Sequence, residues 1–123
     1  MIVEGVVTGG NKIGRKLGFP TANIVVDDTL AAADGVYAAR VTYDGRTYDA
    51  MAYLGRKPSV GGDGKRVLEV HIFDFDTEIY GQKIAVELGR YVRADRRFDS
   101  FDELKEQLKQ DKICISTKNC PTK

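Results

Sequence analysis

Short segments of alternating apolar and polar residues, separated by turn residues at intervals of roughly ten residues, constrain the fold of this chain most strongly. Arg66–Phe73 alternates cleanly, and Asp44-Gly45 is a strong signal for a tight hairpin. The expected strands are Val3–Val7, Thr21–Val26, Val36–Tyr43, Arg46–Leu54, Arg66–Phe73 and Gln82–Val92. Many short strands in a small chain predict an antiparallel β-barrel, because closure removes the exposed sheet edges.

One helix is expected after the last strand. Ser100 and Glu103 have the spacing of a capping box. Apolar residues then recur at helical spacing, at Phe101, Leu104 and Leu108. Lysines suit its far end, at Lys105, Lys109 and Lys112. Beyond Asp111 the pattern fades, so residues 112–123 are expected to form a polar tail.

Length and charge narrow the class of protein. The 123 residues suit one domain, 1–123, with a single core. A net charge of +1, from 19 basic and 18 acidic residues, argues against a nucleic-acid or membrane-surface partner. No bilayer-spanning apolar run and no signal-peptide core are seen. We expect a cytoplasmic protein in which Cys114 and Cys120 are reduced thiols, with a disulfide in the tail as the alternative.

The loop before the second expected strand combines glycines with cations. These residues are Gly9, Gly10, Gly14 and Gly18 with Lys12, Arg15 and Lys16. Thr21 and Asn23 follow, two apart at the start of a strand, so both side chains should face the same way. Hydroxyl and amide oxygens are ligands that Mg²⁺ accepts beside phosphate oxygens and water. The sequence therefore indicates a phosphate-and-magnesium site, with a solvated turn as the alternative.

Glu69 is the candidate general base. It lies in mid-strand between apolar neighbours, where a carboxylate is costly unless it has a partner or a task. From a rigid strand it could take a proton from an attacking hydroxyl. The alternatives are that it faces solvent or pairs with an arginine on a neighbouring strand. His71 shares its face, and a histidine without Cys or His partners is more often structural.

Residues 90–98 are rich in arginine and aromatic side chains. They hold Arg90, Arg93, Arg96 and Arg97 with Tyr91 and Phe98. Guanidinium groups stack on aromatic ligands and bind phosphate. A solvated turn is the alternative for at least two of these arginines. The sequence has neither a Walker-type P-loop nor a Rossmann fingerprint, so phosphoryl chemistry here needs another scaffold.

Taken together, these motifs resemble the riboflavin kinase family, from Gly5 to Asp111. They are Gly5-Val6-Val7, the loop Gly14–Phe19, Pro20-Thr21-Ala22-Asn23, Gly35-Val36-Tyr37, Glu69–Ile72, Tyr80-Gly81, Tyr91-Val92-Arg93 and Phe98-Asp99-Ser100. The resemblance implies a six-stranded antiparallel Greek-key β-barrel with a C-terminal α-helix. It also implies phosphorylation of the riboflavin 5′-hydroxyl by ATP with Mg²⁺, giving FMN and ADP.

The resemblance further implies roles for individual residues. Metal ligands would be Thr21 and Asn23. Nucleotide-binding residues would be Gly9, Arg15, Thr21, Asn23 and Tyr80. Glu69 would act as the base on the hydroxyl, and flavin-binding residues would be Glu69, Arg93, Arg96 and Phe98. Which nucleotide or divalent metal serves best stays open.

One loop departs from the family pattern, which often has Asn and Thr where this chain has Tyr53 and Ser59. Bacterial relatives usually carry an FMN adenylyltransferase domain, so a longer parent chain is one alternative, and FAD synthesis is not predicted here. A flavin- or nucleotide-binding barrel without catalysis is a second candidate function. An oligonucleotide-binding barrel is a third, against which the balanced charge argues.

Overall fold

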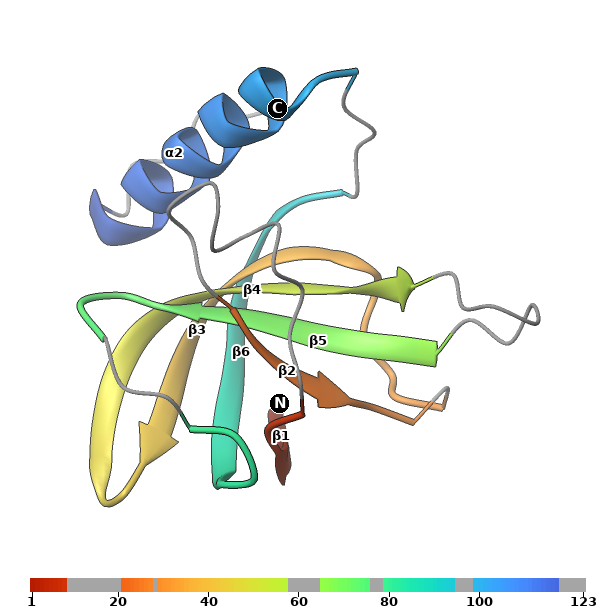
Figure 1. Ribbon diagram of the computed structural model, residues 1–123, viewed down its shortest axis with the longest axis vertical. Helices are drawn as coiled ribbons and strands as arrows, with labels where there is room; N and C mark the ends of the chain where they lie inside the picture. The colour runs from red at the N-terminus through yellow and green to blue at the C-terminus, as the bar shows by residue number, and fades with distance from the viewer. Residues whose placement is uncertain (9–20, 28, 58–64, 76–78, 95–98, 118–123) are drawn as a thin grey trace.

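The computed structural model describes residues 1–8, 21–27, 29–57, 65–75, 79–94 and 99–117. In this part of the chain the strands are β1 (Ile2–Val6), β2 (Ala22–Val25), β3 (Gly35–Tyr43), β4 (Arg46–Lys57), β5 (Lys65–Ile72) and β6 (Lys83–Arg93), followed by helix α2 (Phe101–Thr117). Every expected strand is confirmed, and β4 runs three residues past its expected end at Leu54. Figure 1 shows the strands wrapped into a barrel with α2 lying outside it.

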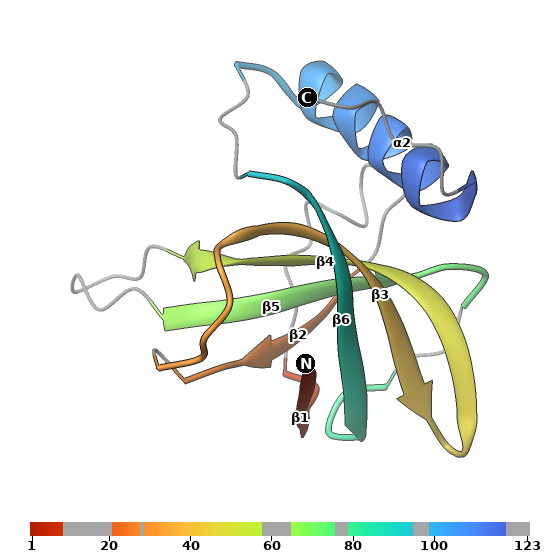
Figure 2. The same cartoon turned by 180° about the vertical axis from the view of Figure 1, so that it is seen from behind.

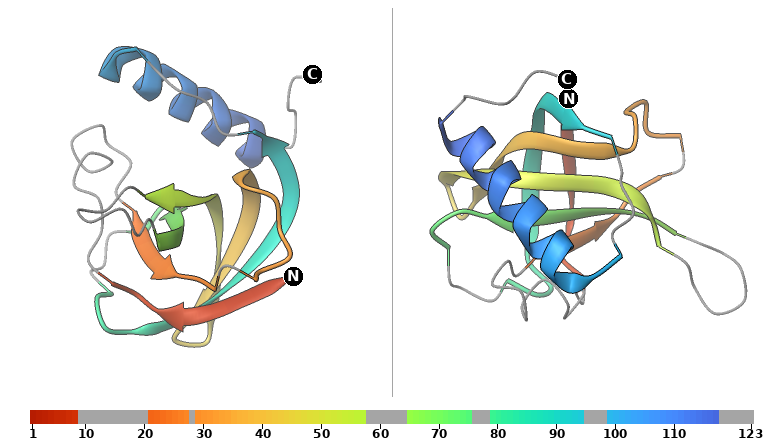
Figure 3. Two further views of the ribbon diagram at one scale, coloured as in Figure 1. Left: turned by 90° about the vertical axis from the view of Figure 1, so that its right-hand side faces the viewer. Right: turned by 90° about the horizontal axis from the view of Figure 1, so that it is seen from above.

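The strands form one antiparallel sheet in the order β1-β6-β3-β4-β5-β2. The two end strands approach each other at Thr8, whose amide donates a hydrogen bond of 2.8 Å to the carbonyl oxygen of Asn23. The sheet is therefore a nearly closed barrel, as predicted (Figure 3). Gly5 allows this approach, because a Cβ there would overlap the Cγ2 methyl of Ile24.

The inner faces of all six strands supply the barrel core. Alternation on β5 is confirmed, since Leu68, Val70 and Ile72 are buried in this core. The hairpin at Asp44-Gly45 is also confirmed, with φ of 52° and 76° as a tight turn requires. No helix among the described residues has the length and hydropathy needed to span a membrane.

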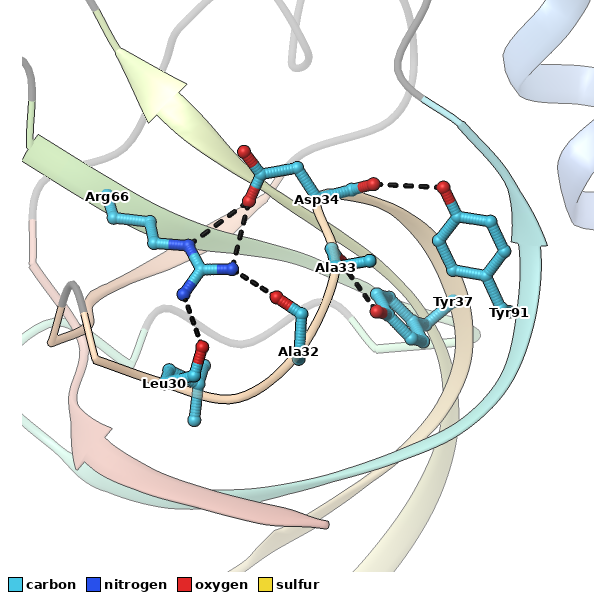
Figure 4. A network of polar contacts seen from close by, with 7 residues as sticks. All are labelled: Leu30, Ala32, Ala33, Asp34, Tyr37, Arg66 and Tyr91. Carbon is cyan, nitrogen blue, oxygen red and sulfur yellow. Dashed lines mark hydrogen bonds and ion pairs between the residues drawn. The ribbon is translucent and has the colours of Figure 1, made fainter.

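Arg66, at the start of β5, holds the connection between β2 and β3 against one end of the barrel (Figure 4). Its guanidinium donates hydrogen bonds to the carbonyl oxygens of Leu30, at 2.7 Å, and Ala32. It also pairs with the carboxylate of Asp34 at 3.1 Å. Because only 8% of the Arg66 side chain is exposed, these acceptors replace the water it loses on folding.

Helix α2 begins with the predicted capping box. The Glu103 amide donates to Ser100 Oγ at 3.2 Å, and the Glu103 carboxylate accepts from the Asp99 amide at 3.1 Å. The helix then continues six residues beyond Asp111, so the expected end there is wrong. Asp111 is itself buried, and a charged residue on the buried face hid the continuation of the pattern to Ile115.

The longer helix changes two further expectations. Its last turn holds no basic residue, so the lysines proposed for its far end lie in mid-helix. Cys114 is buried and disulfide-bonded, so the prediction of a reduced thiol is wrong for this residue. Cys120 lies outside the described residues.

The helix packs against the outer face of the barrel, as Figure 2 and the view from above in Figure 3 show. A second apolar cluster fills this contact. Ile115 and Leu108 come from α2, and Val36, Met51 and Phe73 come from strand β3, strand β4 and the end of β5. The outer face of β3, β4 and β5 is thus partly covered, and the remainder of that face carries the candidate site.

Candidate functional site

Four residues form a row across the outer face of the barrel. Asn23 on β2 pairs with Glu69 on β5, Glu69 pairs with Tyr53 on β4, and Tyr53 pairs with Val36 on β3. Directly paired residues of antiparallel strands project to the same face of a sheet. The row therefore runs from an amide through a carboxylate and a phenol to the apolar cluster under α2.

Two oxygens next to this row are buried without a hydrogen-bond partner. They are Oγ1 of Thr21 and Oδ1 of Asn23, and they are the orphaned side-chain atoms of the described part of the chain. A buried polar atom without a partner costs about 1–3 kcal/mol, so a native structure rarely keeps one without a use for it. The two residues expected to bind a metal thus each have a buried oxygen that could accept a hydrogen bond or bind a cation.

The backbone around Asn23 is fixed although its side-chain oxygen is not. The Asn23 carbonyl oxygen accepts from the amide of Thr8 at 2.8 Å and from its hydroxyl at 3.2 Å. Thr8 and Thr21 are the described residues that flank the glycine-rich loop 9–20 in sequence. Thr8 and Thr21 therefore both lie next to Asn23 at this edge of the barrel.

Tyr80 lies near the C-terminal end of β1. The amide of Gly81 donates to the carbonyl oxygen of Val7 at 2.9 Å, and the Val7 amide donates to the Gln82 carbonyl oxygen at 2.9 Å. Half of the surface of Tyr80 is exposed. The turn bearing Tyr80 thus adjoins Val7, and the family resemblance assigns Tyr80 to the nucleotide.

Glu69 is half-buried on the outer face of β5. His71 lies two residues further along the same face, is buried, and contacts Phe73 edge-to-face with ring centroids 5.6 Å apart. The alternation therefore points Glu69 away from the barrel core and toward Asn23 and Tyr53. The prediction that Glu69 and His71 share a face is confirmed.

Arg93, at the end of β6, is engaged by the helix. Its Nε lies 3.0 and 3.1 Å from the two carboxylate oxygens of Asp111, and its Nη2 lies 2.8 Å from Oδ2. Gln107 donates to the same carboxylate at 2.9 Å. The structure thus places this predicted flavin-binding residue in a contact between β6 and α2.

The other predicted site residues, Gly9, Arg15, Arg96 and Phe98, lie outside the described residues. Sequence reasoning did not place Tyr53 in the row or Asp111 beside Arg93. Finding Tyr53 required the register between β4 and β5, which the residue pattern does not determine. Asp111 stands among other polar residues of the helix, so the sequence gave no sign that it is buried.

The residues present fit a magnesium ion held jointly with a ligand. No group of three or more His, Cys, Asp or Glu side chains in the described ranges could hold a metal ion. Thr21 and Asn23 would instead supply two neutral oxygens. Mg²⁺ favours such a set when phosphate oxygens and water complete its octahedron.

Comparisons with known proteins point to one family. Residues 1–118 match the family model Flavokinase, described as riboflavin kinase. Over 110 residues the chain is 43% identical to the bifunctional riboflavin kinase/FMN adenylyltransferase of Haemophilus influenzae, covering 89% of this chain and 35% of that protein. The curated relatives it matches are longer, and the chain spans between 17% and 50% of the length of the first few.

Two solved structures share the fold. A crystal structure described as a macrolide-efflux protein from Streptococcus pneumoniae is 40% identical with a TM-score of 0.83, over 94% of this chain and 38% of the other. The riboflavin kinase of Trypanosoma brucei has a TM-score of 0.64 at 20% identity, over 94% of this chain and 77% of the other. The second likeness concerns the fold alone.

Proposed function

Because the chain belongs to the riboflavin kinase family, we propose that it transfers the γ-phosphate of ATP to the 5′-hydroxyl of riboflavin, giving FMN and ADP. The observation that carries the proposal is the pair of orphaned oxygens of Thr21 and Asn23, with Glu69 directly opposite Asn23. These observations support a site in which two oxygens that need a cation or a donor lie near a candidate base. Phosphoryl transfer requires positioning and charge stabilisation of this kind.

Thr21 and Asn23 would hold Mg²⁺ together with the phosphate oxygens of the nucleotide. The ion would neutralise charge that develops on the transferred phosphoryl group. The bonds from Thr8 hold the main chain of Asn23, so its side chain projects from a fixed strand position before the ligand arrives. A group positioned in advance avoids the ordering cost that a loop residue would incur.

Glu69 would accept the proton of the riboflavin hydroxyl as the oxygen attacks phosphorus. Its neighbours in the row suggest the direction of attack: the phosphate would lie on the side of Asn23 and the rest of the alcohol on the side of Tyr53. The nucleophile and the leaving group lie roughly in line in such transfers. A phosphate near Asn23 and an alcohol beside Glu69 would be compatible with such a line.

The remaining roles are proposals of the same standing. Tyr80 would lie on the nucleotide side together with Gly9 and Arg15. Residues predicted for the flavin side are Arg93, Arg96 and Phe98. Longer relatives are named as FMN adenylyltransferases too, and an adenylyltransferase domain in a parent chain remains a proposal here, as does a cytoplasmic location.

The proposal is tested by incubating the purified protein with riboflavin and ATP, with and without MgCl₂, and separating the flavins by chromatography. We expect FMN to form in a strictly magnesium-dependent manner. Riboflavin binding without FMN would instead identify a non-catalytic flavin-binding barrel. Retarded single-stranded oligonucleotides at low salt, without flavin turnover, would identify the nucleic-acid alternative.

A further inference from the structure

We propose that the ion pair of Arg93 and Asp111 positions α2 on the acceptor side of Glu69 and so sets the affinity for riboflavin without touching it. The inference rests on the proposed function and adds a positioning role for both residues. The family resemblance implies that Arg93 contacts the flavin directly, whereas here Arg93 acts on flavin binding indirectly, through the position of α2.

The pair is nearly buried and bidentate. Exposed fractions of the side chains are 19% for Arg93 and 3% for Asp111. Nε and Nη2 of the arginine both bond the carboxylate, Gln107 donates a further bond, and Nη1 donates to the Ala94 carbonyl oxygen at 3.2 Å. A carboxylate buried to this extent is tolerated because several donors surround it.

Besides the ion pair, α2 meets the sheet through the Lys112 ammonium, 5.5 Å from the centre of the Phe73 ring, and through apolar side chains. Leu108 and Ile115 meet apolar side chains of the sheet, and the hydrophobic effect by itself has no preferred direction. A bidentate pair between planar groups is satisfied in one arrangement only. Asp111 lies on the same helix face as Leu108 and Ile115, so the pair fixes the position of α2 along and around its own axis.

The position of α2 bears on the acceptor because of the row across the strands. Asn23 marks the phosphate side of Glu69, and Tyr53 marks the other side. Tyr53 and Leu108 both pack against the cluster that contains Ile115. An alcohol that attacks from beside Glu69 therefore has its remaining bulk toward Tyr53 and α2, while the nucleotide lies away from the helix.

The test measures KM for riboflavin and for ATP in R93K and D111N. Both variants keep the size of the side chain, and D111N leaves the arginine available to any ligand. D49N is the control, because Asp49 forms an exposed pair with Arg40 at 3.8 Å. We expect both variants to raise KM for riboflavin about tenfold, with little change in KM for ATP, and the double variant to add little to D111N.

The outcomes separate the possible explanations. If R93K raises KM for riboflavin and D111N does not, Arg93 contacts the flavin directly and the inference is wrong. Equal losses for both substrates with a lowered melting temperature would show a merely structural pair and would also overturn it. If D111N does not fold, R93K with Q107L decides between the same outcomes. Absence of FMN from the wild-type protein would remove the proposed function, whereas wild-type turnover with unchanged variants would remove this inference alone.

Discussion

Asn23 on β2 and Glu69 on β5 lie directly opposite each other on neighbouring antiparallel strands. The pairing brings together an amide whose oxygen lacks a partner and a carboxylate that points away from the barrel core. Both are carried by strands of a nearly closed sheet, so their separation is fixed by backbone hydrogen bonds and not by a mobile loop. A ligand that bridges them would meet a surface already in place.

The orphaned hydroxyl of Thr21 predicts opposite effects on stability and activity. In T21V the unpartnered oxygen is replaced by a methyl group of similar size, so the free energy of unfolding should stay equal or rise by about 1 kcal/mol. The same change removes a proposed metal ligand, so the magnesium concentration for half-maximal activity should rise about tenfold. Thermal unfolding and a magnesium titration of FMN formation measure the two quantities.

Thr42 provides the control for that experiment, because it lies exposed on β3 and faces Thr47. T42V should leave the magnesium requirement as it is in the wild type. A T21V protein that is clearly less stable and fully active would show that the hydroxyl serves the fold and not the site.

Arg66 predicts a large effect on stability. R66M leaves the carbonyl oxygens of Leu30 and Ala32 and the carboxylate of Asp34 without their donor. The Asp34 side chain is 46% exposed, so the expected loss of about 3 kcal/mol in the free energy of unfolding comes mainly from the two carbonyl oxygens left without a donor. R40M removes an exposed ion pair and should lower the free energy of unfolding by less than about 1 kcal/mol. Urea unfolding of both variants checks the difference, and equal midpoints would contradict the role given to Arg66.

The close approach of β1 and β2 at Gly5 predicts that a larger residue there lowers the free energy of unfolding. In G5A the new methyl group would overlap Cγ2 of Ile24, which is buried in the core, so we expect a loss of about 1–3 kcal/mol. G45A gains no close neighbour, and its φ of 76° alone should cost about 1 kcal/mol. Denaturant unfolding compares them. A G5A protein as stable as the wild type would mean that β1 and β2 do not approach as described.

Tyr37 predicts a dependence of stability on alkaline pH. Burial, with the neighbouring Tyr91 adding to it, raises the pKa of Tyr37 above its ordinary value of 10.0. The folded state therefore holds the proton more tightly, so this stabilisation is complete below pH 10 and is lost as pH rises through the folded pKa. Y37F lacks the hydrogen bond from the phenol to the Ala33 carbonyl oxygen, so its free energy of unfolding should be about 1 kcal/mol lower at neutral pH. Above pH 10 its stability should decline less steeply than that of the wild type.

Unfolding midpoints between pH 8 and 11 measure this effect. Y80F serves as the control, because half of Tyr80 is exposed. An identical alkaline decline in the wild type and Y37F would show that the phenol of Tyr37 does not titrate differently in the folded and unfolded states.

Local patterns in the sequence predicted the elements well where local chemistry decides them. The capping box at Ser100 and Glu103 and the hairpin at Asp44-Gly45 depend on neighbours within a few residues, and both are confirmed. The alternation of Leu68 and Val70 predicted the inner face of β5. In each case one short segment contains all the information.

Contacts between distant segments were harder to predict. Nothing in the pattern set the register that brings Asn23 opposite Glu69 and Tyr53, because sliding a strand by two residues keeps the same alternation. The end of α2 was missed because Asp111 takes a buried position through Arg93, eighteen residues away. Metal, nucleotide and flavin roles came from the family resemblance, and they stay predictions for individual residues.

The central claim is that Glu69 is the base for phosphoryl transfer on the face shared with Asn23, and the kcat for FMN formation by E69Q tests it most directly. Removing a general base lowers kcat about 10²–10⁴-fold, while riboflavin should still bind. E87Q, on the exposed side of β6, should match the wild type. An E69Q protein with wild-type kcat would contradict the account.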